Sequence, residues 1–126
     1  MKRAWVWGPV VVMMAVIFIA SSIPDLQQLP GDMSDKTGHS LGYALLGLTL
    51  VRAFAGGRAR AVTWRVVLAT IVAATLYGCS DEFHQRFVRG RTADVWDVVA
   101  DFRGATVAAV AAYTILKLPA VQRRLL

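Results

Sequence analysis

Three stretches of the sequence carry polar side chains that are spaced three or four residues apart. They are Asp35, His39 and Tyr43, then Tyr77, Asp81 and Gln85, and then Asp94, Asp97 and Asp101. Residues at this spacing lie on one face of an α-helix. Each stretch therefore predicts a polar stripe on a helix, and Glu82 and His84 lie beside the second stripe.

The side chains in and beside these stripes suit acid–base chemistry and substrate binding. His39 or His84, oriented by a carboxylate such as Glu82, could transfer a proton near neutral pH. Lys36 or Arg91 could hold a phosphate or carboxylate group of a substrate. Glu82, His84 and His39 are therefore the candidate catalytic residues. The candidate binding residues are Asp35, Lys36, Asp81, Gln85, Arg91, Asp97 and Asp101.

Imidazole and carboxylate side chains also suit a divalent metal ion such as Zn²⁺ or Mn²⁺. The candidate ligands are His39, His84 and Asp81. The His-Glu-x-x-His pattern of helical zinc sites does not occur in the sequence, and Asp81 and His84 form only an i, i+3 pair. We therefore predict no cofactor and keep a divalent metal as an alternative.

The same residues also have a structural interpretation. Asp35 and Asp94 could cap the first turns of two helices. Arg91 could pair with Asp97 or Asp101 and lock two helices together, which would make the polar set a structural clasp. A one-sided set of titratable groups is more than capping requires, so we favour a functional site.

The elements that must position these stripes are predicted to cross a membrane. Of the 126 residues, 56% are hydrophobic and 17% are charged, against about 45–50% and about 25% in an average soluble domain. A helix needs roughly 20 mainly apolar residues to cross the hydrocarbon core. Four segments approach this length, at about residues 4–23, 38–55, 64–85 and 94–118. Because lipid offers the backbone no hydrogen-bond partners, we predict an all-α bundle of four transmembrane helices, with residues 1–126 as a single domain.

The charged residues predict the orientation of this bundle. With four crossings, both termini and the middle loop share one side, which holds nine of the 14 Lys and Arg and no acidic residue. The other side holds the remaining five and all 8 acidic residues. Loops rich in Lys and Arg stay in the cytoplasm. We therefore place both termini in the cytoplasm and the polar stripes at the extracytoplasmic end, and the net charge of +6 gives no evidence for nucleic-acid binding.

Several motifs of the sequence occur together in one known family. They are Ser21-Ser22-x-Pro24, Asp35-Lys36-x-x-His39, Asp81-Glu82-Phe83-His84-Gln85, Gly90-Arg91, Asp97 and Gly104. With these motifs the chain resembles the VanZ-like family over about residues 18–105. The resemblance implies a polytopic membrane protein with an outward-facing polar motif, tied to envelope lipids or to resistance against the glycopeptide teicoplanin. Arg89 and Arg103 depart from the pattern of the family.

Together these observations predict an integral protein of the cytoplasmic membrane and cell envelope. Its extracytoplasmic site is expected to bind an envelope lipid or a lipid-linked cell-wall precursor. The alternative is a membrane-embedded hydrolase or transferase that acts on lipid- or polyprenyl-linked substrates by His/Glu acid–base or metal chemistry, so the sequence leaves open whether the protein is an enzyme. The expected partners are membrane lipids, including anionic head groups, and no nucleic acid. A homo-oligomer is an open alternative.

Overall fold

A computed structural model describes residues 2–24 and 35–125, and within these residues every regular element is a helix. The four long helices are α1 (Arg3–Ser22), α2 (Asp35–Phe54), α3 (Trp64–Gln85) and α4 (Val95–Leu116). A 3₁₀ turn, η2 (Ala59–Ala61), separates α2 from α3, and a short helix, α5 (Pro119–Leu125), follows α4. The all-α prediction is confirmed, although α2 starts earlier than predicted and α5 was not predicted.

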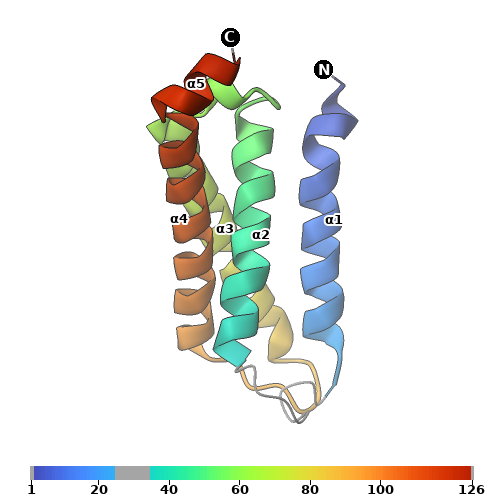
Figure 1. The fold of residues 1–126 in the computed structure, drawn as a ribbon. Helices are drawn as coiled ribbons and strands as arrows, with labels where there is room; N and C mark the ends of the chain where they lie inside the picture. Colours follow the sequence, from blue (N-terminus) through green and yellow to red (C-terminus); the bar gives the residue numbers. More distant parts are fainter. Residues whose placement is uncertain (1, 25–34, 126) are drawn as a thin grey trace.

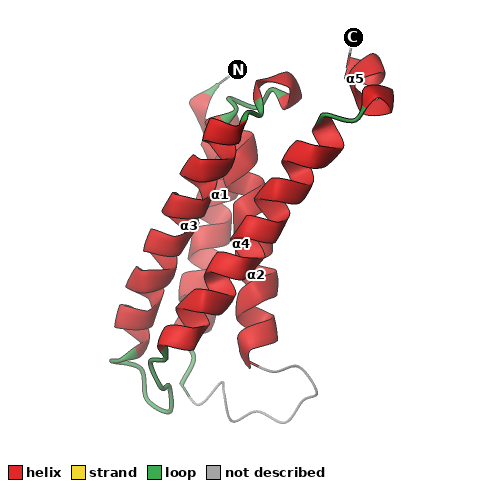
Figure 2. Cartoon of the chain, turned by 90° about the vertical axis from the view of Figure 1, so that its left-hand side faces the viewer, coloured by secondary structure: helices red, strands yellow, loops and turns green. Residues whose placement is uncertain are grey.

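The four long helices lie side by side and alternate in direction along the chain (Figure 1). The start of α1, η2 and α5 lie at one end of the bundle, which we call the α5 end (Figure 1). The connection between α3 and α4 lies at the other end, which we call the His39 end (Figure 2). α2 packs against α1, α3 and α4. The starts of α2 and α4 therefore meet the end of α3 at the His39 end.

The outer surface of the bundle is apolar. Large hydrophobic side chains are exposed along all four long helices, among them Val11 in α1, Leu45 in α2, Leu76 in α3 and Val107 in α4. Extended apolar surface of this kind is typical of a face that contacts lipid or another protein. Several of the buried side chains are polar instead, among them Asp97 and Asp101 of α4.

Three of the described helices, α1, α3 and α4, are long and apolar enough to cross a membrane. α2 has the length but is not one of them, because its sequence begins with Asp35 and Lys36 and also carries His39 and Arg52. The prediction of four transmembrane helices is thus supported for three of them. A crossing by α2 stays a prediction.

α2 and α4 approach each other closely because small residues lie between them. A Cβ atom on Gly104 would lie 2.1 Å from the carbonyl oxygen of Ser40, and one on Gly47 would lie 3.1 Å from the backbone of α4. The Ser40 hydroxyl donates a hydrogen bond of 3.1 Å to the carbonyl oxygen of Ala100. This close packing holds His39, the neighbour of Ser40, against α4.

α1 is attached to the other helices through its backbone carbonyl groups. Pro9 lies inside α1 and lacks the N–H group that would bond to the carbonyl oxygen of Trp5. Arg52 of α2 donates to that oxygen at 2.8 Å and to the carbonyl oxygen of the following residue at 3.2 Å. The Tyr77 hydroxyl of α3 donates to the carbonyl oxygen of Met14 at 2.6 Å. Polar side chains of two other helices therefore position α1.

Candidate functional site

The imidazole of His39 contacts two buried carboxylates of α4. Its Nδ1 atom is 2.7 Å from Oδ1 of Asp101, and its Nε2 atom is 3.8 Å from Oδ2 of Asp97. The two aspartates are four residues apart and share one face of α4. Their side chains are only 0% and 1% exposed, and that of His39 is 8% exposed. Each ring nitrogen therefore faces a different buried carboxylate.

The last turns of α3 add two more buried carboxylates, those of Asp81 and Glu82. Oxygens of Asp81 and Asp101 lie within 4.8 Å of each other and of a nitrogen of His39, and Glu82, Asp97 and His39 form a second group with the same spacing. We call these five residues the His39 cluster. It combines one residue of α2, two of α3 and two of α4, as the three polar stripes of the sequence predicted.

Burial leaves Oε1 of Glu82 and Oδ2 of Asp101, both in the His39 cluster, without a hydrogen-bond partner among the described residues. Oε2 of Glu82 accepts a 2.8 Å hydrogen bond from the backbone N–H of Asp94. Asp101 fits against α3 because Gly78 has no Cβ, which would lie 2.7 Å from Oδ2. Unpaired buried carboxylate oxygens are energetically costly, so the cluster is suited to hold a proton or a cation.

A lysine lies at the edge of the cluster. Nζ of Lys36 is 3.0 Å from Oδ2 of Asp94 and 3.2 Å from Oδ1 of Asp97. Asp94 is the N-cap of α4, where its side chain accepts a 3.0 Å hydrogen bond from the backbone N–H of Trp96. That N–H group and then Lys36 hold the pKa of the Asp94 carboxyl below its usual value. Lys36 thus offsets part of the negative charge where the cluster meets the surface.

His84, Gln85 and Arg91 contact the end of α1. Nε2 of His84 lies 2.9 Å from the hydroxyl oxygen of Ser22, and Nε2 of Gln85 donates to the hydroxyl of Ser21 at 3.3 Å. Arg91 donates to backbone carbonyl groups of the same turn, at 3.1 Å in the closer case. The structure thus brings His39 and Glu82 together and directs His84 to α1.

The remaining predicted residues differ in where the structure places them. Asp35 begins α2, and its side chain lies outside the described part of the structure. Arg91, which the structural interpretation paired with Asp97 or Asp101, donates to backbone oxygens of α1. Among the predicted metal ligands, His39 and Asp81 share a group that could hold an ion, and His84 belongs to neither such group.

A groove of about 680 Å³ lies between α2 and α4, next to the His39 cluster. Its basic side chains are Lys36 and Arg103, and its apolar ones include Leu41, Trp96 and Phe102. Lys36 was predicted from the sequence as a binding residue, but the other residues of this lining were not. Trp96 and Arg103 are seven residues apart and share a face of α4, which is the signal that could have located the groove.

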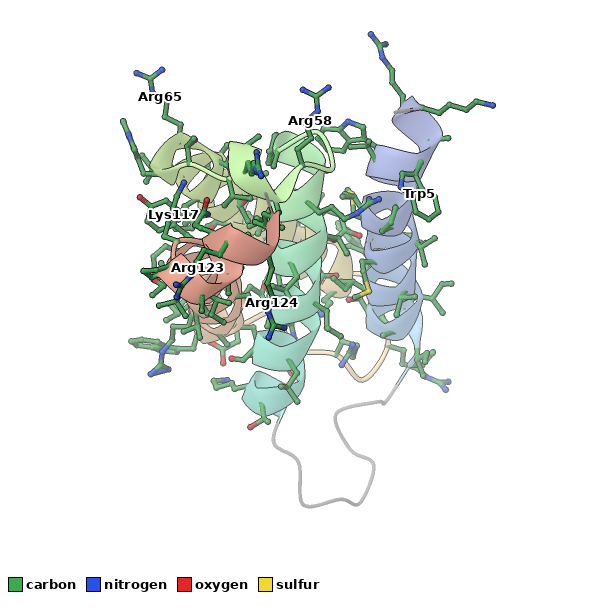
Figure 3. The ribbon with its side chains drawn as sticks, turned by 45° about the horizontal axis from the view of Figure 1, so that its top comes forward. Trp5, Arg58, Arg65, Lys117, Arg123 and Arg124 are labelled. Atoms are coloured by element: carbon green, nitrogen blue, oxygen red, sulfur yellow. The ribbon has the colours of Figure 1, made fainter. Side chains whose placement is uncertain are left out.

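The α5 end of the bundle is rich in basic side chains, in contrast to the His39 end with its buried carboxylates (Figure 3). Its labelled side chains are Trp5, Arg58, Arg65, Lys117, Arg123 and Arg124. All acidic residues within the described ranges belong to the last turns of α3, to the first turns of α2 and α4, or to the residue that caps α4. Within the described residues, the bundle therefore has one basic end and one end that contains the acidic groups.

Comparison with known proteins places these features in a family. No curated protein and no solved structure matches the chain. The family model described as VanZ/LLP1 matches residues 6–117, which include most of α1 and all of α2, α3 and α4. The match covers the His39 cluster, the groove and the contacts between α1 and His84. The chain therefore belongs to the VanZ/LLP1 family and is a membrane protein of the VanZ type.

Proposed function

We propose that this membrane protein binds an anionic lipid of the cell envelope in the groove between α2 and α4. The observation that carries the proposal is the lining of the groove, in which the basic Lys36 and Arg103 lie among the apolar Leu41, Trp96 and Phe102. Lysine and arginine side chains are the usual partners of phosphate groups. A phosphate head group would pair with them while its hydrocarbon chain lay along the apolar side chains.

The position of Arg103 supports this proposal. It is an exposed residue in the third turn of α4, about 13 Å along the helix axis from the Asp94 cap. An arginine at such a depth needs an anionic partner or must extend its side chain toward the interface. A lipid phosphate beside Arg103 and Lys36 would supply that partner.

We further propose that all four long helices cross the cytoplasmic membrane, with the His39 end outside. Lys and Arg are retained on the cytoplasmic side of membrane proteins, which favours a cytoplasmic α5 end. The outward face of α2 exposes Leu41, Leu45 and Leu48, so it would meet lipid despite the polar start of the helix.

Cysteine labelling in whole cells tests this orientation. In a Cys79→Ser background, Arg86→Cys at the end of α3 should react with a membrane-impermeant maleimide in intact cells. Arg58→Cys beside η2 should react only after lysis. Labelling of Arg58→Cys alone in intact cells would show the opposite orientation, and labelling of both variants would contradict the crossing of α3.

Lipid retention by the purified protein tests the groove. The wild type, purified in detergent, should retain phosphatidylglycerol or undecaprenyl phosphate in preference to phosphatidylcholine by native mass spectrometry. Arg103→Gln and Lys36→Gln should weaken this retention, and added salt should weaken it further. The matched control is Arg65→Gln at the α5 end, which should leave it unchanged. Equal retention of anionic and zwitterionic lipid, or an unaffected Arg103→Gln variant, would contradict the proposal.

A lipid-linked cell-wall precursor in the groove would connect the protein to teicoplanin resistance. We propose this role because the basic side chains of the groove suit a phosphate group and its apolar side chains suit a polyprenyl chain. Expression of the wild type in a teicoplanin-susceptible bacterium should raise the inhibitory concentration, and Arg103→Gln should abolish the rise while Arg65→Gln keeps it. An unchanged inhibitory concentration with correctly inserted wild type would reject the resistance role and leave lipid binding untouched.

A lipid-site hydrolase or transferase is the second candidate, favoured by the contact between His39 and Asp101. A carboxylate on Nδ1 orients the ring and leaves Nε2 to act as a general base. Purified wild type should then release phosphate or transfer the head group of a lipid-linked phosphate, and Asp101→Asn should slow this step. A wild type that binds the lipid and forms no product would reject the enzymatic role.

A further inference from the structure

We propose that His39, Glu82 and Asp97 bind a divalent transition-metal ion at the His39 end of the bundle. The three residues come from α2, α3 and α4, and each offers a ligand atom within 4.8 Å of the other two. One imidazole and two carboxylates form a set that Zn²⁺ and Mn²⁺ accept. The proposal goes beyond lipid binding and does not depend on it, because these ligands belong to the buried cluster and not to the apolar lining of the groove. It is an alternative to the general-base role of Nε2 of His39, because a metal-bound nitrogen cannot accept a proton.

The hydrogen bond between His39 and Asp101 prepares one ring nitrogen for the metal. Oδ1 of Asp101 lies 2.7 Å from Nδ1, and a carboxylate can only accept, so Nδ1 carries the proton. In the neutral ring, Nε2 then carries the lone pair that a metal needs. Metal-binding histidines commonly donate their second nitrogen to a carboxylate in this way. Asp101 is therefore a positioning residue, and Nε2 of His39 is the ligand atom.

The separation between His39 and Asp97 fits two ligands of one ion. Nε2 is 3.8 Å from Oδ2 of Asp97, which is longer than a hydrogen bond. Two tetrahedral ligands at about 2.0–2.2 Å from a metal ion are about 3.3–3.6 Å apart. A small movement toward each other would bring both atoms into the coordination shell. The other oxygen of Asp97 contacts Lys36 at 3.2 Å, so the two oxygens of this carboxylate have separate roles.

Glu82 supplies independent support. Its side chain is more than nine-tenths buried, with 7% of the residue exposed. Oε2 accepts the backbone N–H of Asp94, whereas Oε1 has no hydrogen-bond partner among the described residues. Four buried carboxylates surround His39, and Lys36 is the cation that the described ion pairs place beside them. A divalent cation would satisfy Oε1 and offset this excess of negative charge.

The second group with the same spacing, His39, Asp81 and Asp101, is less suited to hold the ion. Nδ1 of His39 already donates to Asp101, and the Tyr43 hydroxyl donates to Asp81 at 3.4 Å. A metal bound through Nδ1 would have to displace the hydrogen bond to Asp101, and the Tyr43 hydroxyl already occupies one oxygen of Asp81. The ion is therefore placed on the Nε2 side, with Glu82 and Asp97.

Metal content of the purified protein tests the proposal. The full chain is purified in detergent, stripped with a chelator, reloaded with Zn²⁺ or Mn²⁺, desalted and analysed by inductively coupled plasma mass spectrometry. The wild type should retain stoichiometric metal and gain thermal stability on loading. His39→Ala and Glu82→Gln should lose retention, and Asp101→Asn should weaken affinity by about 10–100-fold, as expected when the carboxylate that orients a metal-binding histidine is changed.

Two variants at the same end of the bundle serve as controls. His84→Ala removes the other histidine and Asp94→Asn removes a surface carboxylate, and both should retain metal as the wild type does. If His39→Ala or Glu82→Gln fails to fold, the Mn²⁺ form of the wild type should still show coupling to a histidine nitrogen in pulsed electron paramagnetic resonance. A wild type that retains neither metal, a His39→Ala variant that retains as much as the wild type, or a loss of metal in His84→Ala would overturn the proposal.

Discussion

Nδ1 of His39 lies 2.7 Å from Oδ1 of Asp101, a contact that joins the second turn of α2 to the second turn of α4. Both side chains are almost fully buried. The contact crosses the same pair of helices that Gly104 and Ser40 hold at close range. A buried polar contact in such a tightly packed interface should couple its two residues energetically.

A double-mutant cycle measures this coupling. His39→Ala and Asp101→Ala should be non-additive by about 1.5–3 kcal/mol, the range for hydrogen bonds to charged groups. The free energy of unfolding is measured by denaturant titration in detergent micelles. The matched cycle of His84→Ala with Asp101→Ala should be additive to within about 0.5 kcal/mol, because His84 contacts Ser22. Additivity in both cycles would show that the contact between His39 and Asp101 contributes no stability.

The packing of α2 on α4 leads to a second prediction. Gly104→Ala places a methyl group against the backbone of Ser40 and should destabilise the protein by about 1–3 kcal/mol or more. Gly42→Ala is the matched control in α2, because nothing lies within 4 Å of its Cβ position. It should be neutral or stabilise the helix by up to about 1 kcal/mol. Equal effects of the two substitutions on thermal stability would contradict the close approach of α2 and α4.

A third prediction concerns the carbonyl oxygen that Pro9 leaves without an N–H partner inside α1. Arg52→Leu removes the donor that bonds to this oxygen of Trp5 and should cost about 1–3 kcal/mol. In a Pro9→Ala background the new N–H group bonds to the same oxygen, so Arg52→Leu should cost less. The cation–π contact of Arg52 with the Trp5 ring is lost in both backgrounds and cancels in the comparison. An identical cost in both backgrounds, measured by denaturant titration, would show that Arg52 does not replace the missing hydrogen bond.

A fourth prediction follows from the lowered pKa of Asp94. A carboxyl whose pKa is lower in the folded protein stabilises the fold above its unfolded pKa, and this stabilisation is lost as the pH falls through the folded value. Asp94→Asn keeps a capping side chain but loses the charge that attracts Lys36. The variant should therefore melt below the wild type at pH 6, and the difference should shrink as the pH falls below about 3.9, the usual pKa of Asp in an unfolded chain, and vanish once the folded carboxyl is protonated as well. A difference in Tm that grows on acidification would contradict the direction of the shift.

Much of the fold could be predicted from hydropathy alone. The apolar segments marked all four long helices to within a few residues, and the polar Thr63 and Asp94 that precede α3 and α4 act as caps in the structure. α5 was missed, although Pro119 occupies the first helical position, where proline is favoured. Its seven residues carry too little apolar periodicity to separate it from the end of α4.

The candidate site could be predicted in part, because helical spacing gives the face of each helix but not the contacts between helices. His39, Asp81 and Asp101 meet as their stripes predicted. His84 was grouped with Glu82, but residues two apart on a helix do not face each other. Once Glu82 is buried in the cluster, His84 must point elsewhere, and it reaches Ser22 of α1.

The groove could not be predicted, because its lining depends on which turn of α2 lies beside which turn of α4. That register is set by the contact of Gly104 with Ser40 and by the hydrogen bond of Ser40 to Ala100. Neither contact can be read from the two helices separately. Lys36 was predicted as a binding residue and Arg103 was noted as a departure from the family pattern, but their proximity across the groove was not predicted.

The attachment of α1 has a consequence for how this protein can evolve. Arg52, Tyr77 and Arg91 all donate to main-chain oxygens of α1, and every amino acid carries such an oxygen. Most outward-facing residues of this helix can therefore be exchanged for other apolar residues without loss of any of these hydrogen bonds. Sequence drift in related chains should accordingly be greatest in this first segment and least at the three donor positions.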